Sequence, residues 1–320
     1  MADIIALLLP FFGLILVGYV AARVTRQPAE ALGWMNTFII YAALPALFFK
    51  LVSRTPVEQL TRLDFILGEI GATYIVFTIL FLIGYFIRRN SFGDCTIQAF
   101  AGSYGNIGYM GPGLALLAFG EAAAVPVALI VCFENAAHFI VTPAMMAMAG
   151  GDQRPAREVM GEIIRKVVFH PFILSTALGF CVAAIQVQPP EPVARLVDYL
   201  AQAAAPCALF AMGVTLAIRP VRRIPGEIVY ILFFKLILLP LTTYLVLSLI
   251  GNFEPVWIYS AVLLSALPTA TNVFVISQQY GVWQERASAS ILIITLASVI
   301  TLPGVLFAIH MGLLPADLVP

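Results

Sequence analysis

The sequence predicts an all-α integral membrane protein with ten transmembrane helices, arranged as two inverted repeats of five. Three observations lead to this prediction. Of the 320 residues, 61% are hydrophobic and only 11% are charged, and the mean hydropathy is +0.98. This is more apolar surface than a soluble core of that length would bury. Apolar runs of about 20 residues, the length that crosses a bilayer, recur along the chain, and the two halves share residues at a constant spacing.

Ten apolar runs are interpreted as transmembrane helices. They are 3–22, 33–52, 65–87, 95–119, 122–147, 167–187, 196–218, 227–250, 255–280 and 285–312. The first run has no basic residue before it and no cleavage site after it, so we expect it to be retained as a span. The longest connection, 150–166, divides the chain near its midpoint.

The basic residues fall on the two sides of the predicted membrane in unequal numbers, twelve against four. The twelve are Arg23, Arg26, Arg88, Arg89, Arg154, Arg157, Arg165, Lys166, Arg219, Arg222, Arg223 and Arg286. The four are Lys50, Arg54, Arg62 and Arg195. Basic residues concentrate on the cytoplasmic side, so we expect a multi-pass protein of the cell inner membrane with both termini periplasmic. Five helices in each half then give the second half the opposite orientation.

An internal repeat relates the two halves. Pro10 recurs as Pro171, a shift of 161 residues. The same shift matches Phe11 to Phe172, Gly18 to Gly179, Ala22 to Ala183, Pro45 to Pro206, Phe49 to Phe210 and Gly120 to Gly281. One offset across several helices predicts a single transporter domain, 1–320, made of repeat one (1–149), the connecting loop (150–166) and repeat two (167–320).

The fourth helix of each repeat is interrupted. GSYGNIGYMGPG, residues 102–113, holds five glycines and a proline, and SALPTATNVFVISQQYG occupies 265–281. Pro112 and Pro268 cannot donate a backbone hydrogen bond. Unpaired backbone groups are costly in hydrocarbon, so such breaks persist where they line a polar cavity. Matched breaks in the two halves indicate a transport site; the alternative is ordinary proline kinks with small residues for helix packing.

The breaks also offer polar groups for a substrate. A half-helix that begins at mid-membrane depth exposes N–H groups and the positive end of its dipole, which favour an anion such as a carboxylate. Neutral donors nearby add to this, and they are Asn106, Tyr109, Thr269, Thr271 and Asn272. Each of them has an alternative role, which is to cap backbone groups that the break releases.

The inverted repeat, the stretch GNIGYMGPGLALLAFG from Gly105 and the second break resemble the auxin efflux carrier family, whose bacterial members are described as malate or malonate permeases. The resemblance spans nearly the whole chain. It implies a fold like that of bile acid symporters and sodium/proton antiporters, in which broken helices 4 and 9 cross. It also implies alternating access of the elevator type, in which a mobile core (helices 3, 4, 5, 8, 9 and 10) moves against a static panel (helices 1, 2, 6 and 7).

Carried over by position, this resemblance places the substrate site at 106–112 and 268–272. It adds Gly108, Gly111, Pro112 and Pro268 to the neutral donors named above. The connection after the fifth helix is short here, whereas plant members often carry a long hydrophilic loop. Plant-type regulation is therefore not expected.

Few ionisable residues lie inside the spans, and such residues are functional candidates. Glu134 and Asn135 lie in the fifth span with His138 one turn on, Glu69 lies in the third span and Lys235 in the eighth. We expect no cofactor, and we take Glu134, Asn135, Glu69 and Lys235 as candidates for coupling transport to protons or sodium. The alternatives are that Glu134 and Lys235 form a structural pair, that Lys235 extends to the interface, and that His138 is a packed, hydrogen-bonded side chain.

The predicted function is secondary active transport of a small organic anion, either a mono- or dicarboxylate or an auxin-like acid. An enzyme is not expected, because the three histidines are far apart, no GxSxG or HExxH motif occurs and the four cysteines have no metal-ligand spacing. The alternatives are a cation-coupled carrier of a neutral or amphipathic solute on the same fold, and a membrane sensor without transport. The expected partners are the anion and the lipid bilayer, with no nucleic acid; a homodimer is left open.

Overall fold

The computed structural model describes residues 2–150, 157–158, 161, 164–165, 168–187, 189–218 and 225–315. Most of the predicted connecting loop is outside this part of the chain. So are the predicted cytoplasmic residues Arg154, Lys166, Arg219, Arg222 and Arg223. Over the described residues the secondary structure is helical, with one isolated β-bridge and no named strand.

Helices lie at each of the predicted segments of the first half. They are α1 (Ala2–Thr25), η1 (Ala29–Leu32), α2 (Gly33–Phe38), η2 (Ile39–Ala43), α3 (Leu44–Ser53), α4 (Val57–Leu60), α5 (Leu63–Leu82), η3 (Ile83–Ile87), α6 (Phe92–Ser103), α7 (Gly111–Phe119), η4 (Gly120–Ala123) and α8 (Ala124–Met148). The second half has fewer described elements. It has α10 (Pro171–Ile185), α11 (Glu191–Ile218), α12 (Ile228–Phe233), η5 (Phe234–Leu238), α13 (Leu239–Ile250), α14 (Pro255–Ser265), α15 (Asn272–Tyr280) and α16 (Gln284–His310).

Six helical runs in the described residues are long and apolar enough to cross a membrane. They are Glu30–Ser53, Val57–Ile87, Gly111–Met148, Glu191–Ile218, Ile228–Ile250 and Gln284–His310. Three shorter apolar helices accompany them, at Leu9–Thr25, Pro171–Ile185 and Pro255–Ser265. The chain is thus an all-helical, multi-pass membrane protein, while the count of ten spans and their inverted orientation stay predictions.

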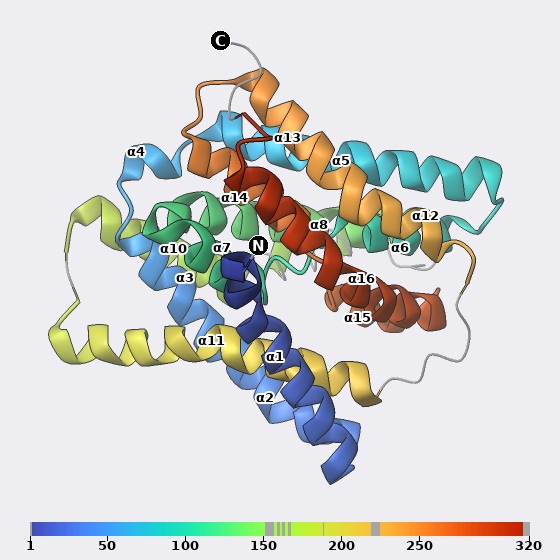
Figure 1. The fold of residues 1–320 in the computed structure, drawn as a ribbon, viewed down its shortest axis with the longest axis horizontal. Coiled ribbons are helices and arrows are strands. Elements are labelled where there is room, and N and C mark those ends of the chain that lie inside the picture. Colours follow the sequence, from blue (N-terminus) through green and yellow to red (C-terminus); the bar gives the residue numbers. More distant parts are fainter. Residues whose placement is uncertain are drawn as a thin grey trace.

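The helices pack in two groups, and the candidate site lies where the groups meet. Figure 1 shows α1, α2 and α11 on one side of the molecule and α5, α12 and α13 on the opposite side. In the first group α1 packs against α11, and α3 packs against both α10 and α11. In the second, α5 packs against α6 and α13, and α13 against α14.

Two very close helix contacts hold the first group together, and they are copies of each other. A Cβ atom at Gly18 of α1 would overlap the carbonyl oxygen of Phe210 in α11, and one at Gly179 of α10 would lie 3.2 Å from the carbonyl oxygen of Phe49 in α3. The shift of 161 residues that relates Gly18 to Gly179 also relates Phe49 to Phe210. This exchange of partners between the halves supports the predicted repeat.

A substitution at the α1–α11 contact is expected to destabilise the protein. A Cβ at Gly213 of α11 would overlap the carbonyl oxygen of Ile15 in α1. Because backbone cannot move aside as a flexible side chain does, we expect Gly213→Ala to lower the free energy of unfolding by about 1 to 3 kcal/mol. Gly13→Ala, at a site in α1 with no atom within 4 Å of the added Cβ, is the control. Equal stabilities for the two variants in detergent unfolding would contradict the close contact.

Three π-helical turns interrupt the long helices in the described part of the chain, at η2, η3 and η5. Such turns are rare and are often found at functional sites, since they widen the helix and redirect side chains. Tyr41 of η2 lines the candidate-site cavity described below, and Lys235 lies in η5.

Candidate functional site

Each predicted interruption separates two half-helices. In the first half α6 ends at Ser103 and α7 begins at Gly111, and in the second α14 ends at Ser265 and α15 begins at Asn272. Pro112 lies in the first turn of α7, where a missing N–H costs nothing. The local sequence therefore accounts for where the first break ends.

The two breaks bind each other through their backbones. Asn106 N donates to the carbonyl oxygen of Pro268 at 2.8 Å, and Ala270 N donates to the carbonyl oxygen of Tyr104 at 3.0 Å. These bonds flank a single antiparallel bridge between Gly105 and Thr269. Each break thus provides hydrogen-bond partners for some of the backbone N–H and C=O groups that are unpaired in the other. Such pairing is needed because unpaired backbone groups are costly in a low-dielectric interior.

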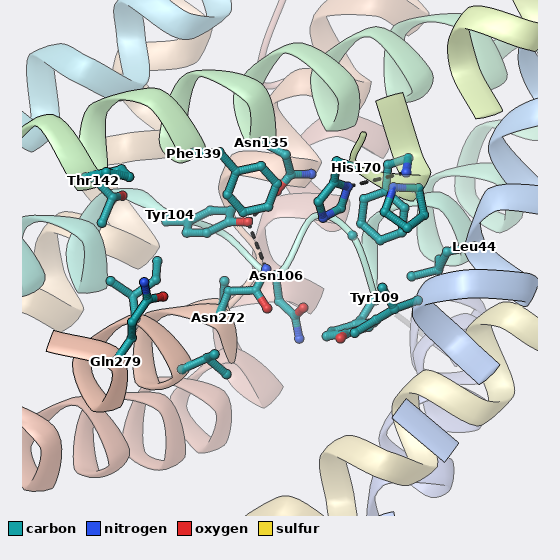
Figure 2. Close-up of a pocket in the computed structure, with 18 of the residues that line it drawn as sticks. Leu44, Tyr104, Asn106, Tyr109, Asn135, Phe139, Thr142, His170, Asn272 and Gln279 are labelled. Atoms are coloured by element: carbon teal, nitrogen blue, oxygen red, sulfur yellow. Dashed lines mark hydrogen bonds between the residues drawn. The ribbon is translucent and has the colours of Figure 1, made fainter. Parts of the chain in front are cut away.

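A cavity of about 660 Å³ lies against the paired breaks (Figure 2). Both helix groups line it, with Tyr41, Leu44 and Phe172 on one side and Asn135 and Asn272 on the other. Four predicted substrate residues line this cavity, and they are Asn106, Gly108, Tyr109 and Asn272.

Five other predicted substrate residues shape the breaks without lining the cavity, and they are Gly111, Pro112, Pro268, Thr269 and Thr271. Thr269 is fully buried, and its hydroxyl donates to the carbonyl oxygen of Ala101 at 2.6 Å. This is the capping role that the sequence left open. Gly111 begins α7, and a Cβ there would lie 3.3 Å from the Leu264 side chain. Thr271 precedes α15 and makes no side-chain cap bond.

Asn106 places an amide with spare hydrogen-bonding capacity at the cavity. The residue is 2% exposed, and its Nδ2 lies 3.2 Å from the Sδ atom of Met212 in α11. A thioether is a weak acceptor. The amide can therefore exchange this contact for a stronger one to an anionic ligand.

Tyr104 connects the cavity to the fifth predicted span. Asn272 Nδ2 donates to the Tyr104 hydroxyl at 3.1 Å, and that hydroxyl donates to Asn135 Oδ1 (Figure 2). The Tyr104 ring also lies 4.1 Å, between centroids, from the ring of His138. The sequence reasoning did not select Tyr104, although it lies inside the first break; an aromatic residue among glycines was the available signal.

The ionisable candidates Glu69, Glu134 and Lys235 form a buried cluster and do not line the cavity. Glu134 Oε1 lies 3.2 Å from His138 Nε2, and His138 Nδ1 lies 3.0 Å from the Tyr74 hydroxyl. Glu69 of α5 is a neighbour of Glu134. Glu69 and Glu134 are each 3% exposed, and His138 is fully buried and hydrogen-bonded, which was one of the alternatives.

Lys235 approaches the same cluster from η5. Its Nζ atom donates to the carbonyl oxygen of Ser265, the last residue of α14, at 2.5 Å. The position of a Cβ at Gly105 would be 3.4 Å from that Nζ atom. A cation at the carboxyl end of a helix is favourable. Lys235 therefore stabilises the end of α14, where the second break begins. Within the described residues, no group of three His, Cys, Asp or Glu side chains forms a metal-ligand set.

Removing either cavity amide is expected to weaken substrate binding. We expect Asn106→Ala and Asn272→Ala each to lower the affinity for a carboxylate by about 1 to 3 kcal/mol, since a buried charge loses one donor. Calorimetry with malonate and with its neutral diamide tests this. Equal losses for the acid and the amide would argue against an anion at this site.

Comparisons with known proteins agree with a transport role. A family model described as "Membrane transport protein" matches residues 3–306. The chain is 66% identical over 321 residues to a protein named "Putative malonate transporter" from Rhizobium meliloti (strain 1021), with 100% of both chains covered. It is 24% identical over 301 residues to the "Uncharacterized transporter YfdV" of Escherichia coli (strain K12), covering 92% of this chain and 94% of the relative.

Proposed function

Because the chain belongs to the membrane transport protein family, we propose that it is a secondary active transporter of a small organic anion, working by alternating access. Membership confirms the resemblance to auxin efflux carriers and the prediction of a transporter rather than an enzyme. The observation that carries the finer proposal is the pair of hydrogen-bonded helix breaks at the wall of a cavity. Breaks of this kind form substrate sites in secondary transporters.

A carboxylate is the proposed charged group of the substrate. The half-helices α7 and α15 begin at the breaks, where first-turn N–H groups have no partner within the helix. Those of Leu114, Val273 and Phe274 bond carbonyl oxygens of preceding residues, and the remaining ones can meet an anion. Asn106 and Asn272 add side-chain amides at the cavity wall. These neutral donors hold an anion without a buried arginine, and the name of the 66% identical relative points to a dicarboxylate.

An elevator-type movement is proposed for the two helix groups. The panel would comprise α1 to α3, α10 and α11, and the core α5 to α8 and α12 to α16. The main cavity lies between them and is lined by Arg165, which is predicted to be cytoplasmic. Two further cavities, of about 920 and 320 Å³, are both lined by Lys50 and Arg54, which are predicted to be periplasmic.

Coupling is proposed to occur at the buried cluster of Glu69, Glu134 and Lys235. Two neighbouring buried carboxyl groups hold a proton or a sodium ion between them more readily than they hold two negative charges. Tyr104 lines the cavity, its ring lies 4.1 Å from the ring of His138, and His138 Nε2 lies 3.2 Å from Glu134 Oε1, so these contacts connect the cluster to the cavity. Binding of an ion would thus be sensed at the substrate site.

The test of the proposed function is counterflow in proteoliposomes. Liposomes preloaded with malonate should accumulate labelled malonate, and preloading with malonamide should give no accumulation. A neutral solute as effective as the acid would favour the cation-coupled carrier of neutral solutes. Binding of malonate without counterflow would favour the sensor.

The predicted orientation has a separate test. In a variant without the four native cysteines, Ala2→Cys and Leu318→Cys should react with an impermeant maleimide in intact spheroplasts, because the basic-residue asymmetry places both termini in the periplasm. Arg157→Cys, on the predicted cytoplasmic loop, should react only after lysis. The opposite pattern would reverse the orientation.

A further inference from the structure

His170 is a polar residue of the cavity wall that the proposed site does not yet use. It precedes α10, so it belongs to the panel, whereas Asn106 and Asn272 belong to the core. Its ring contacts two others, with its centroid 4.7 Å from that of Phe139 and 4.7 Å from that of Phe172. Figure 2 shows the ring at the cavity. These contacts fix its orientation.

The hydrogen bond at one ring nitrogen determines what the other nitrogen offers. His170 Nδ1 accepts the backbone N–H of Phe172 at 3.3 Å, which caps α10. A nitrogen that accepts carries no proton, so the neutral ring has its proton on Nε2. Nε2–H is therefore a donor, and no hydrogen bond to it is seen among the described residues. A donor of this kind needs an acceptor when the cavity closes around a ligand.

We infer that His170 is a specificity residue that receives the second carboxylate of a short dicarboxylate, while the paired breaks hold the first. This rests on the proposed function of organic-anion transport. The two ends of the substrate would then join the panel to the core. Arg165, which is exposed and also lines the cavity, adds a positive charge for a dianion that enters. A monocarboxylate would leave the His170 donor without a partner, so it would bind less tightly.

Two substitutions distinguish the role of Nε2 as a donor to the ligand from the role of Nδ1 in capping α10. His170→Asn keeps an acceptor near the Nδ1 position and removes the Nε2 donor, whereas His170→Gln places an amide donor near the Nε2 position. The measurement is inhibition of malonate counterflow by malonate and by its half-amide, a monoanion of similar size. We expect the wild type to prefer malonate about tenfold, the Asn variant to lose this preference and the Gln variant to retain most of it.

The outcomes distinguish this inference from the proposed function. If the Asn variant transports and keeps the wild-type preference, His170 is not a specificity residue, although the protein remains an anion carrier. If the wild type shows no counterflow with either compound, both proposals fail. His170→Ser, which caps α10 without reaching the cavity, replaces the Asn variant if that protein does not fold. A lost preference in the Ser variant supports the inference in the same way.

Discussion

Replacing Lys235 with methionine is expected to abolish transport and to lower the free energy of unfolding by about 3 to 5 kcal/mol. The side chain is fully buried, and its ammonium group binds the Ser265 carbonyl beside the carboxyl groups of Glu69 and Glu134. Methionine preserves most of the unbranched apolar stem but leaves a buried negative charge without its cation. It also leaves the carboxyl end of α14 without a donor at the point where the second break begins.

A double variant shows whether charge or packing causes this loss. Lys235→Met combined with Glu134→Gln removes one charge of each sign, so we expect it to regain part of the stability lost in the single variant. Lys50→Met is the control, since Lys50 pairs with Asp198 at 2.7 Å in a partly exposed position and such pairs contribute about 0 to 1 kcal/mol. No recovery in the double variant would assign the role of Lys235 to packing and the Ser265 bond alone.

Glu134→Gln is expected to separate coupling from translocation. Glutamine has the size of glutamate and preserves an oxygen that faces His138, but it cannot release a proton or hold a cation by charge. We expect counterflow of malonate to continue, while accumulation driven by a pH or sodium gradient falls to the level of liposomes without protein. The two assays use the same proteoliposomes and differ only in the imposed gradient.

The matched control is Glu121→Gln, at an exposed position in η4. It should leave both counterflow and gradient-driven uptake unchanged. Gradient-driven accumulation in Glu134→Gln equal to that of the wild type would make Glu134 a structural partner of His138 and Glu69. Loss of counterflow as well, with the fold intact, would place Glu134 in substrate translocation and not only in coupling.

The helix breaks could be predicted from the sequence because local chemistry determines them. The glycines of 102–113 allow the backbone to depart from helical geometry, and Pro112 fits the first turn of the half-helix that follows. Apolar runs of membrane-spanning length similarly located the helical segments to within a few residues at most ends. These features depend on residues near each other in the chain.

Other features depend on contacts between distant segments, and the sequence did not determine them. For Lys235 the alternatives considered were a pair with Glu134 or an extended conformation at the interface, yet its hydrogen-bond partner is a backbone carbonyl of the second break. His170 was at the edge of a predicted span and carried no signal of its own. Its role becomes visible only when α10 brings it to the cavity that the breaks and α8 line.

The close contact between Gly18 and Phe210 also bears on how the protein is made. Roughly 190 residues separate the two positions, and ribosomes add about 5 to 20 residues per second. α1 therefore spends on the order of 10 to 40 s in the bilayer before its partner α11 has been synthesised. Lipid tails solvate an apolar helix at little cost, so α1 can remain in the bilayer without α11. In the same way, α3 is inserted before its partner α10 has been synthesised. A ribosome that stalls before α10 would therefore leave both α1 and α3 without the partners of their closest backbone contacts.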